Sequence, residues 1–444
     1  MKTAIPCLYS SYGRYIDEFR AIPSIYDCMK VVERRVLYTM FRTAGKKLVK
    51  SARVVGDCIG LYHPHGDLST YETLVNLVNR GFGIGQGNFG FDGVKYSPPA
   101  AYRYTEVKLM PILHTIAFDL IKYVPYSDPE ALDEVQPDFI PCCVPIGMIG
   151  SGVITGISFN ATKIPRYTFP MLVNRLQNIL MRQRNPNVAP YTIIPNIPNC
   201  DIEEATPGEF EKILTTGTGK IIIKPHYKVD RSGIHVYGRP PMGCSSWIKD
   251  DTDDKKAQFA CDDLSGKAGF EALFTPKNGT RYDQDFVTMI VKTIESTITF
   301  SCNIWDGNNV VLKSIDDLIL ISYNKWCECL KAKWNEVAAN LKAGIREVDI
   351  ISVIRELIND HNIKLVKLDD LLNVFTNDYK PKHPNCDFTI DEIRDVCKKR
   401  TIHKLFEFVG DKQSLLQKLG QIESKLNNFD VEAFNVVLSF VNPS

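Results

Sequence analysis

Apolar residues recur at helical spacing in three short segments near the start of the chain. Residues 26–43 carry an apolar stripe with arginines beside it, and residues 67–79 place Leu74, Leu77 and Val78 on one face. Between them, Ser51 is a plausible N-cap for a short helix with the sequence ARVVGDCIG. Short helices joined by a tight turn predict a helix-turn-helix. Residues 81–109 are rich in Gly and Pro, so we expect a loop leading into β-structure, as in a wing.

The pattern changes twice further along the chain. Over residues 140–320, short β-rich runs such as GKIIIKPHYKV alternate with turns, which predicts a second, α/β domain. From about residue 321 the chain is mainly helical, and two apolar seams follow alternating steps of three and four residues. The first seam comprises Cys327, Leu330, Trp334, Val337 and Leu341; the second comprises Leu415, Leu419, Ile422, Leu426 and Phe429.

The two seams flank a compact segment at about 361–400. This favours an antiparallel helix pair with a small domain at its tip, although two ordinary amphipathic helices in a bundle fit the spacing equally well. The predicted fold class is therefore α+β and multidomain, with domains at 1–150, 151–320 and 321–444.

Composition is ordinary for a globular protein, at 44% hydrophobic and 24% charged residues in 444. No apolar run reaches the roughly 18–20 residues of a membrane span, and the first residues lack a secretory signal, so we expect a cytoplasmic protein without a membrane partner. The thirteen cysteines contain no CxxC spacing, which favours reduced, mostly buried thiols. Residues 245–268 are polar and acidic, and Asp250, Asp251, Asp253 and Asp254 are expected to be solvated in an exposed insertion.

The net charge of +1 conceals a local excess of positive charge. Between Lys30 and Arg53 there are eight Lys or Arg residues and one acid, Glu33. A charge run is usually a solvated helix face, but here no acidic partners at i,i+4 are interleaved. The cluster could instead neutralise DNA phosphates, which makes Lys50 and Arg53 candidates for DNA contact.

Three residue types suited to breaking a DNA strand occur together in this region. A tyrosine nucleophile keeps the energy of the phosphate ester in a covalent intermediate, but its pKa of about 10 requires help from a cation or base. Arg103, directly before Tyr104, offers a fixed positive charge and a bidentate fork for phosphate. His63 and His65, in HPHGD, can transfer protons near neutral pH. Each signal is weak alone, since the chain holds 19 tyrosines.

Taken in order, these motifs resemble one family closely. The chain carries RAIPSIYDCMKVVERRVLY, KSARVVGDCIGLYHPHGDLSTYETL, GQGNFG and AAYRYTEVKL, and a fainter similarity continues through GMIGSGVITGISFNATKIP. Their order and spacing resemble the breakage-reunion region of type IIA DNA topoisomerases, nearest to the A-type subunits of DNA gyrase and topoisomerase IV. The resemblance implies a winged-helix DNA-breakage domain, an α/β tower domain, and a coiled-coil arm that ends in a dimer C-gate.

The resemblance also implies residue roles. Tyr104 would form a 5′-phosphotyrosyl bond, Arg103 would hold the scissile phosphate, and Val153 would be an apolar wedge that bends DNA. The residues expected along the cleaved segment are His65, Arg20, Lys30, Arg34 and Arg35, and His63 is a further candidate. Departures from the family pattern include Cys28 in place of the usual Gly, which implies an altered turn, and Glu33 in place of the usual His.

The sequence shows no acidic motif for Mg²⁺ and no ATP-binding domain. We therefore expect Mg²⁺ and ATP to be bound by a partner, an ATPase and TOPRIM-bearing subunit, and we assign no metal ligands to this chain. We also expect a homodimer on double-stranded DNA, with relaxation or decatenation as the reaction. The chain has no C-terminal DNA-wrapping segment like that of gyrase, which suggests a split phage or viral enzyme.

Two other classes of function remain open. One is a structural DNA-binding protein with the same winged helix and dimer contacts that does not cut DNA. The other is a zinc-dependent nuclease built on HPH, for which only two of the usual three or four ligands are near in sequence.

Overall fold

The computed structural model describes residues 11–91, 93, 97–127, 134–158, 160–241, 247, 258–266, 269–360, 368–399 and 411–441. The chain forms two compact units, Met1–Cys329 with Val437–Ser444, and Leu330–Val436. The four aspartates of the predicted acidic insertion, at 250–254, lie outside the described residues. Among the helices of these described ranges, none is both long and apolar enough to span a membrane.

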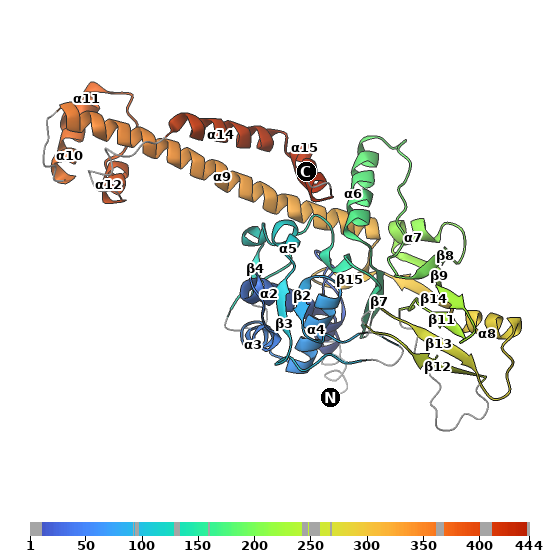
Figure 1. Ribbon diagram of the computed structural model, residues 1–444. Coiled ribbons are helices and arrows are strands. Elements are labelled where there is room, and N and C mark those ends of the chain that lie inside the picture. Colours follow the sequence, from blue (N-terminus) through green and yellow to red (C-terminus); the bar gives the residue numbers. More distant parts are fainter. Residues whose placement is uncertain are drawn as a thin grey trace, which may run out of the picture. The chain divides into compact units, whose positions relative to one another are not determined.

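The first unit begins with three helices packed beside a small antiparallel sheet (Figure 1). Helix α2 packs against both α3 and α4, and β3 lies between β1 and β2. The elements are η1 (Asp17–Ala21), α2 (Val31–Ala44), β1 (Val49–Lys50), α3 (Ser51–Leu61), α4 (Asp67–Asn79), β2 (Gly83–Gln86), β3 (Glu106–Leu109) and α5 (Ile112–Ile116). The predicted helix at 67–79 is confirmed at both ends. The prediction that Ser51 caps α3 is wrong by one residue, since Lys50 is the N-cap.

Helix α2 begins five residues later than predicted, because residues 26–29 form a turn. Cys28 takes a φ of 54°, a left-handed conformation that glycine adopts most easily. The backbone therefore keeps a left-handed conformation at this position, although Cys28 stands where the family usually has Gly. Gly147 packs directly on it: a Cβ at Gly147 would lie 1.9 Å from the Cys28 carbonyl oxygen.

Two sheets, of five and four strands, follow in the first unit, together with two two-stranded sheets. The larger has the strand order β6-β7-β14-β9-β8, and the smaller the order β10-β11-β13-β12. The strands are β4 (Tyr126–Ser127), β5 (Gln136–Pro137), β6 (Val153–Ile157), β7 (Ala161–Pro165), β8 (Cys200–Glu204), β9 (Thr218–Pro225), β10 (Tyr227–Val229), β11 (Ile234–Val236), β12 (Phe259–Asp263), β13 (Ala272–Pro276), β14 (Ser296–Ser301), β15 (Asn303–Trp305) and β16 (Val310–Leu312). The predicted mixture of strands and helices over 140–320 is confirmed.

Further helices of this unit are α6 (Phe169–Arg184), α7 (Glu209–Thr216) and α8 (Gln284–Ile294), with single turns at η2 (Ile121–Tyr123) and η3 (Ile146–Met148). Helix α7 packs against β9 of the larger sheet. Helix α8 packs on the smaller sheet through Phe286 and Ile290, in a core that includes Trp247. On α6, the fully buried Arg175 pairs with Asp316 at 2.7 Å and with Glu211 at 2.9 Å.

The second unit contains most of the long helix α9 (Ile315–Asp360), followed by α10 (Leu368–Val374), η4 (Phe375–Tyr379), α11 (Lys380–Lys382), α12 (Ile390–Lys399), α14 (Lys412–Asn427) and the first part of α15 (Phe429–Val441). Ion pairs from Lys342 to Glu423 and from Lys412 to Asp349 show that α9 and α14 run antiparallel. The small core at the end of α9 includes Ile354, Leu371, Phe375 and Ile393.

The predicted seams differ from the structure in detail. Leu330 and Trp334 are buried as expected, but the other buried positions nearby in α9 are Trp326, Cys329 and Ala338. Cys327, Val337 and Leu341 are half-buried. The second seam is half-buried throughout and is interrupted at Asn428, where α14 ends.

Candidate active site

Tyr104 lies in a tight turn that enters β3, and buried hydroxyl groups hold this turn in place. The Tyr104 amide donates to the Ala101 carbonyl at 2.8 Å. The Thr105 hydroxyl donates to Ser51 at the start of α3 and also contacts the Tyr71 hydroxyl of α4, at 2.8 and 2.9 Å. Thr105 and Ser51 are fully buried, so the turn has a fixed position relative to both helices.

The neighbouring residues add two more supports. The Tyr102 hydroxyl donates to Asp67, the first residue of α4, at 3.1 Å, and the Tyr102 ring packs edge-on against Tyr71. On the other side, Gly87 has a φ of 100°, and a Cβ there would lie 3.3 Å from the Tyr104 carbonyl oxygen. These contacts fix the backbone of the turn, while the Tyr104 side chain remains exposed to solvent.

The Tyr104 side chain is 64% exposed and lies against the side chain of Arg103. The guanidinium carbon of Arg103 is 4.6 Å from the centre of the Tyr104 ring. Hydrogen bonding to Tyr104 raises the pKa of Arg103 further above its usual value. The pair can therefore present a phenol oxygen and a fixed positive charge to the same phosphate, which is the arrangement that a tyrosine nucleophile requires.

His63 and His65 lie at the opposite end of α3 from Ser51. Their rings pack edge-on with centroids 4.5 Å apart, and the His63 Nδ1 is 3.0 Å from Arg35 Nη1. Burial, reinforced by the charges of Arg35, His65 and Arg20, lowers the pKa of His63 to about 3. His63 is therefore neutral at physiological pH, whereas His65 is half-buried beside it. With a guanidinium beside its Nδ1, His63 is a poor metal ligand.

Five of the six Lys and Arg residues proposed for DNA contact fall into two groups, and the sixth, Lys30, is half-buried. Arg34 and Arg35 are 8% and 1% exposed, and protein partners occupy their guanidinium groups. Arg34 forms a bidentate pair with Asp27 at 2.7 and 3.1 Å, and Arg35 donates to Gln136 at 2.7 Å. The other group, exposed to solvent, comprises Arg20, Lys50 and Arg53.

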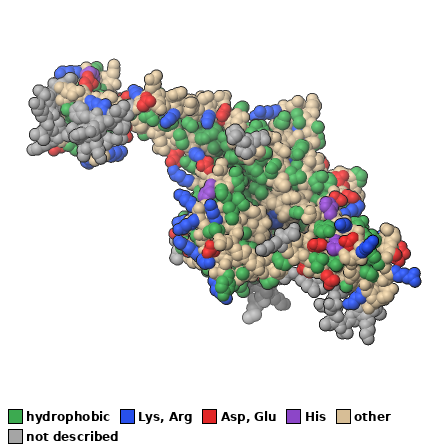
Figure 2. Space-filling view, viewed as in Figure 1, with side chains coloured by type: hydrophobic (Ala, Val, Ile, Leu, Met, Phe, Trp, Pro, Cys, Tyr) green, Lys and Arg blue, Asp and Glu red, His purple; other side chains and the backbone are tan. Residues whose placement is uncertain are grey.

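The charge excess over residues 30–53 is smaller than the sequence indicates. Lys50 pairs with Glu106 at 2.7 Å, and Arg42 with Glu134 at 2.5 Å. Arg53 has an i,i+4 partner in Asp57 at 3.7 Å, so the expectation of no such partner is wrong for this residue. Even so, Figure 2 shows Lys and Arg side chains gathered on the side of the first unit where α2 and α3 lie.

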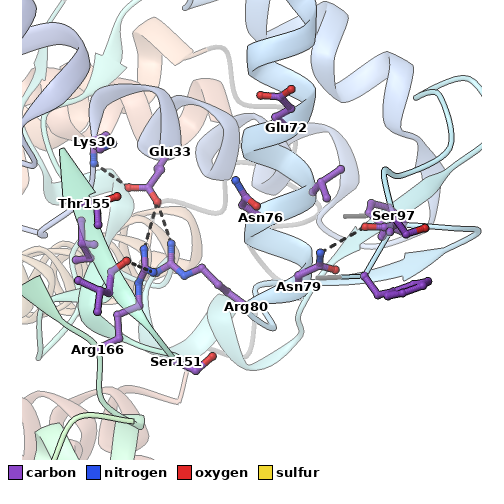
Figure 3. A pocket seen from close by; sticks show the side chains of 16 residues that line it. Lys30, Glu33, Glu72, Asn76, Asn79, Arg80, Ser97, Ser151, Thr155 and Arg166 are labelled. Carbon is purple, nitrogen blue, oxygen red and sulfur yellow. Dashed lines mark hydrogen bonds and ion pairs between the residues drawn. The ribbon is translucent and has the colours of Figure 1, made fainter. Parts of the chain in front are cut away.

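Lys30 and Val153, predicted from separate motifs, line the same cavity of about 690 Å³ (Figure 3). Its wall includes four further charged residues that were not among the predicted DNA contacts: Glu33, Glu72, Arg80 and Arg166. Glu33 accepts from Arg80 Nη1 at 2.9 Å and lies 3.8 Å from Arg166. In the sequence, Glu33 stood out as the one acid in the basic run and as a departure from the family, and no sequence signal distinguished the two arginines.

Among the described residues, no three His, Cys, Asp or Glu side chains gather in a way that could hold a metal ion.

Comparison with known proteins identifies the family. Residues 20–380 match the family model for the A-type subunit of DNA gyrase/topoisomerase IV. The chain belongs to this family. The match includes α2 to α4, the Arg103–Tyr104 turn and the cavity beside Val153, so the site described above lies within the region that the chain shares with the family.

Individual members of the family are similar over half of the chain. The A-type subunit of DNA gyrase from Haemophilus influenzae is 36% identical over 240 residues, and that from Escherichia coli is 34% identical over 239. The A-type subunit of topoisomerase 4 from Neisseria gonorrhoeae is 33% identical over 244 residues. Each alignment covers 50% of this chain but only 26% to 30% of the relative, so the whole relatives extend well beyond what is matched.

Proposed function

We propose that this chain is the DNA-cleaving and rejoining subunit of a type IIA topoisomerase. The observation that carries the proposal is the contact between the exposed Tyr104 phenol and the Arg103 guanidinium, on a turn clamped between α3 and α4. Membership of the gyrase and topoisomerase IV family supports the same assignment.

In the proposed reaction, the Tyr104 oxygen attacks a backbone phosphorus and the bond to the 3′-oxygen breaks. The phenol loses its proton, the 3′-oxygen leaves as a hydroxyl, and the DNA 5′-phosphate stays on the tyrosine as an ester. One ester replaces another, so the 3′-hydroxyl can attack in turn and reseal the strand. Arg103 offsets the charge on the phosphate, and we assign proton transfer to His65.

The wider assembly is part of the same proposal. Helices α2 to α4 with β1 to β3 would form the winged-helix breakage domain within 1–150, followed by a tower at 151–320 and a coiled-coil arm with a dimer C-gate at 321–444. A homodimer would cut both strands of double-stranded DNA and pass a second duplex through the break. We also propose that Mg²⁺ and ATP are bound by a partner subunit.

The exposed residues Arg20, Lys50 and Arg53 are the proposed contacts to the DNA backbone. Lys30 and Val153, which line the cavity described above, are proposed as further DNA contacts. We retain His63 as a neutral, buried support for His65. Relaxation or decatenation as the reaction, a location in the cytoplasm and a phage or viral source remain predictions from the sequence.

Trapping of covalent protein–DNA adducts with detergent tests the proposal, in a complex of this chain with its partner subunit. Tyr104→Phe should abolish the adduct and leave duplex binding within about twofold, because only the nucleophilic oxygen is lost. Tyr102→Phe, in the same turn, is the matched control and should still form adducts. Adducts that persist in Tyr104→Phe would refute the assignment of the nucleophile.

The alternative of a structural protein that binds DNA without cutting it predicts no adduct from the unaltered chain. The same experiment therefore separates the two functions. The exposed phenol against an arginine favours cleavage, since a purely structural turn gains nothing from an unburied tyrosine side chain.

A further inference from the structure

Glu33 joins two arginines to the strand that carries Val153. Arg80 comes from the C-terminal end of α4 and Arg166 follows β7, and both converge on the Glu33 carboxylate of α2 (Figure 3). Glu33 also accepts from the Lys30 amide at 3.0 Å, which closes the first turn of α2. One carboxylate thus ties together three parts of the chain that are far apart in sequence.

The two arginines hold one short segment, residues 147–153, by its carbonyl groups. Arg80 Nη2 donates to Gly147 at 2.9 Å and to Ile149 at 3.2 Å. Arg166 donates from Nε to Gly147 at 3.3 Å and from Nη1 to Val153 at 3.1 Å. The carbonyl group of Val153 itself is therefore held by a guanidinium that lies 3.8 Å from the Glu33 carboxylate.

The charges of Glu33, Arg80 and Arg166 strongly affect one another because the two arginine side chains are buried side by side. The Arg80 and Arg166 side chains are only 9% and 13% exposed. Burial lowers the pKa of Arg80, and burial together with Arg80 lowers that of Arg166 to about 9, while Glu33 opposes both shifts. Two buried guanidinium groups side by side repel each other, and Glu33 lowers the cost of placing them there.

We propose that Glu33, Arg80 and Arg166 form a brace that fixes residues 147–153 and so sets the position from which Val153 enters and bends the DNA. The inference rests on the proposed function, since it takes Val153 as the wedge. It assigns Glu33 as a positioning residue: the carboxylate acts through the arginines and does not touch DNA. The residue that departs from the family pattern thereby gains a role in deforming the substrate.

The physical basis is the cost of bending. Unstacking a base step costs free energy, and a rigidly held apolar side chain between the bases can offset that cost by its contacts with them. A side chain on a loosened segment can move out of the base step and so loses these contacts. Loosening the brace should therefore weaken binding to intact duplex, which must be deformed. It should spare a duplex that already has a one-nucleotide gap at the bend, because that DNA is deformed at little cost.

The experiment uses the full chain with Tyr104→Phe as background, so that the readout does not depend on cleavage. A short duplex labelled at both ends reports bending by energy transfer, and affinity is measured for intact and gapped forms. Glu33→Gln should reduce the energy transfer and weaken binding to intact duplex roughly tenfold, with binding to gapped duplex within about twofold. Glu211→Gln, which alters a carboxylate against the buried Arg175, is the matched control and should change neither.

Arg166→Lys provides a second variant if Glu33→Gln folds poorly. It keeps the positive charge but loses the paired bonds to Gly147 and Val153, so it should show the same selective loss on intact duplex. Arg166→Gln removes the charge, and its slope of log affinity against log salt should still match that of the unaltered chain if Arg166 contacts no phosphate. A slope smaller by about 0.9 would mean that Arg166 contacts a phosphate, and would overturn the positioning role.

Equal losses on intact and gapped duplex, or unchanged bending in both brace variants, would also overturn the inference. A failure of the proposed cleavage function gives a different result, since covalent adducts would then be absent from the unaltered complex whatever the brace variants do.

Discussion

The buried pair of Arg34 and Asp27 yields the sharpest prediction about the basic cluster. Arg34 resembles a DNA-contacting residue in sequence, yet Asp27 holds it bidentately with both side chains nearly inaccessible. We predict that Arg34→Gln acts on folding and not on phosphate contact. Breaking one side of a buried ion pair typically costs about 3–5 kcal/mol.

The remaining partners of Asp27 narrow the expected loss in the free energy of unfolding. Without Arg34, the Asp27 carboxylate still accepts from the Met29 amide at 3.0 Å and the Ile140 amide at 3.1 Å. Two of its four hydrogen bonds therefore remain, which places the expected loss near the lower end, about 3 kcal/mol in the free energy of unfolding. Arg34→Gln with Asp27→Asn should lose less than the two single changes added together, with a coupling of about 2 kcal/mol.

Urea unfolding followed by tryptophan fluorescence measures this loss, because Trp305 and Trp326 are both buried in the first unit. Arg53→Gln is the matched control on an exposed arginine and should change the unfolding free energy by less than about 0.5 kcal/mol. Two results together would contradict the prediction: Arg34→Gln lowers the free energy of unfolding by less than about 1 kcal/mol, and it lowers the slope of log DNA affinity against log salt by about 0.9. They would show that Arg34 binds a DNA phosphate in place of Asp27.

Three further outcomes are expected. Arg103→Gln should slow formation of the covalent adduct by about a hundredfold without changing the urea midpoint, because the side chain is exposed and acts on developing charge; an unchanged rate would contradict this. Since the pKa of His63 is lowered from 6.5 to about 3, stability present above pH 6.5 should be lost as the pH falls toward 3, by up to about 1.4 kcal/mol per unit, and His63→Asn should remove that slope in acid unfolding curves. Gly147→Ala should destabilise severely, since its Cβ would lie 1.9 Å from the Cys28 oxygen, whereas Gly60→Ala in α3 meets nothing within 4 Å and should stabilise by roughly 0.5–1 kcal/mol in the same urea assay.

The spacing of apolar residues predicted those helices whose ends are determined by nearby residues in the sequence. Helix α4 was located at both ends because its apolar spacing and its flanking Gly residues are local signals. The start of α2 was missed because the turn at Cys28 depends on its packing against Gly147, over a hundred residues away. The buried stripe of α9 differs from the predicted seam for a similar reason, since the partners of its first turns come from distant segments.

The site was predicted in part. The adjacency of Arg103 and Tyr104 is local, so the sequence was sufficient to propose their contact. The run of basic residues could not distinguish Arg34 and Arg35, which are buried, from Lys50 and Arg53, which are exposed, because the partner Gln136 lies 101 residues from Arg35. Glu33, Arg80 and Arg166 come together only through tertiary packing, and neither spacing nor composition connects them.

If Tyr104 is the nucleophile, its oxygen becomes linked to the 5′ end of a broken DNA strand. The decisive comparison uses two DNA duplexes, one labelled at the 3′ end of the cut strand and one at its 5′ end, after trapping with the reconstituted complex. We expect the 3′ label to migrate with the protein, the 5′ label to be released, and a peptide containing Tyr104 to carry the nucleotide. Retention of the 5′ label, or attachment to any other residue, would contradict the assignment.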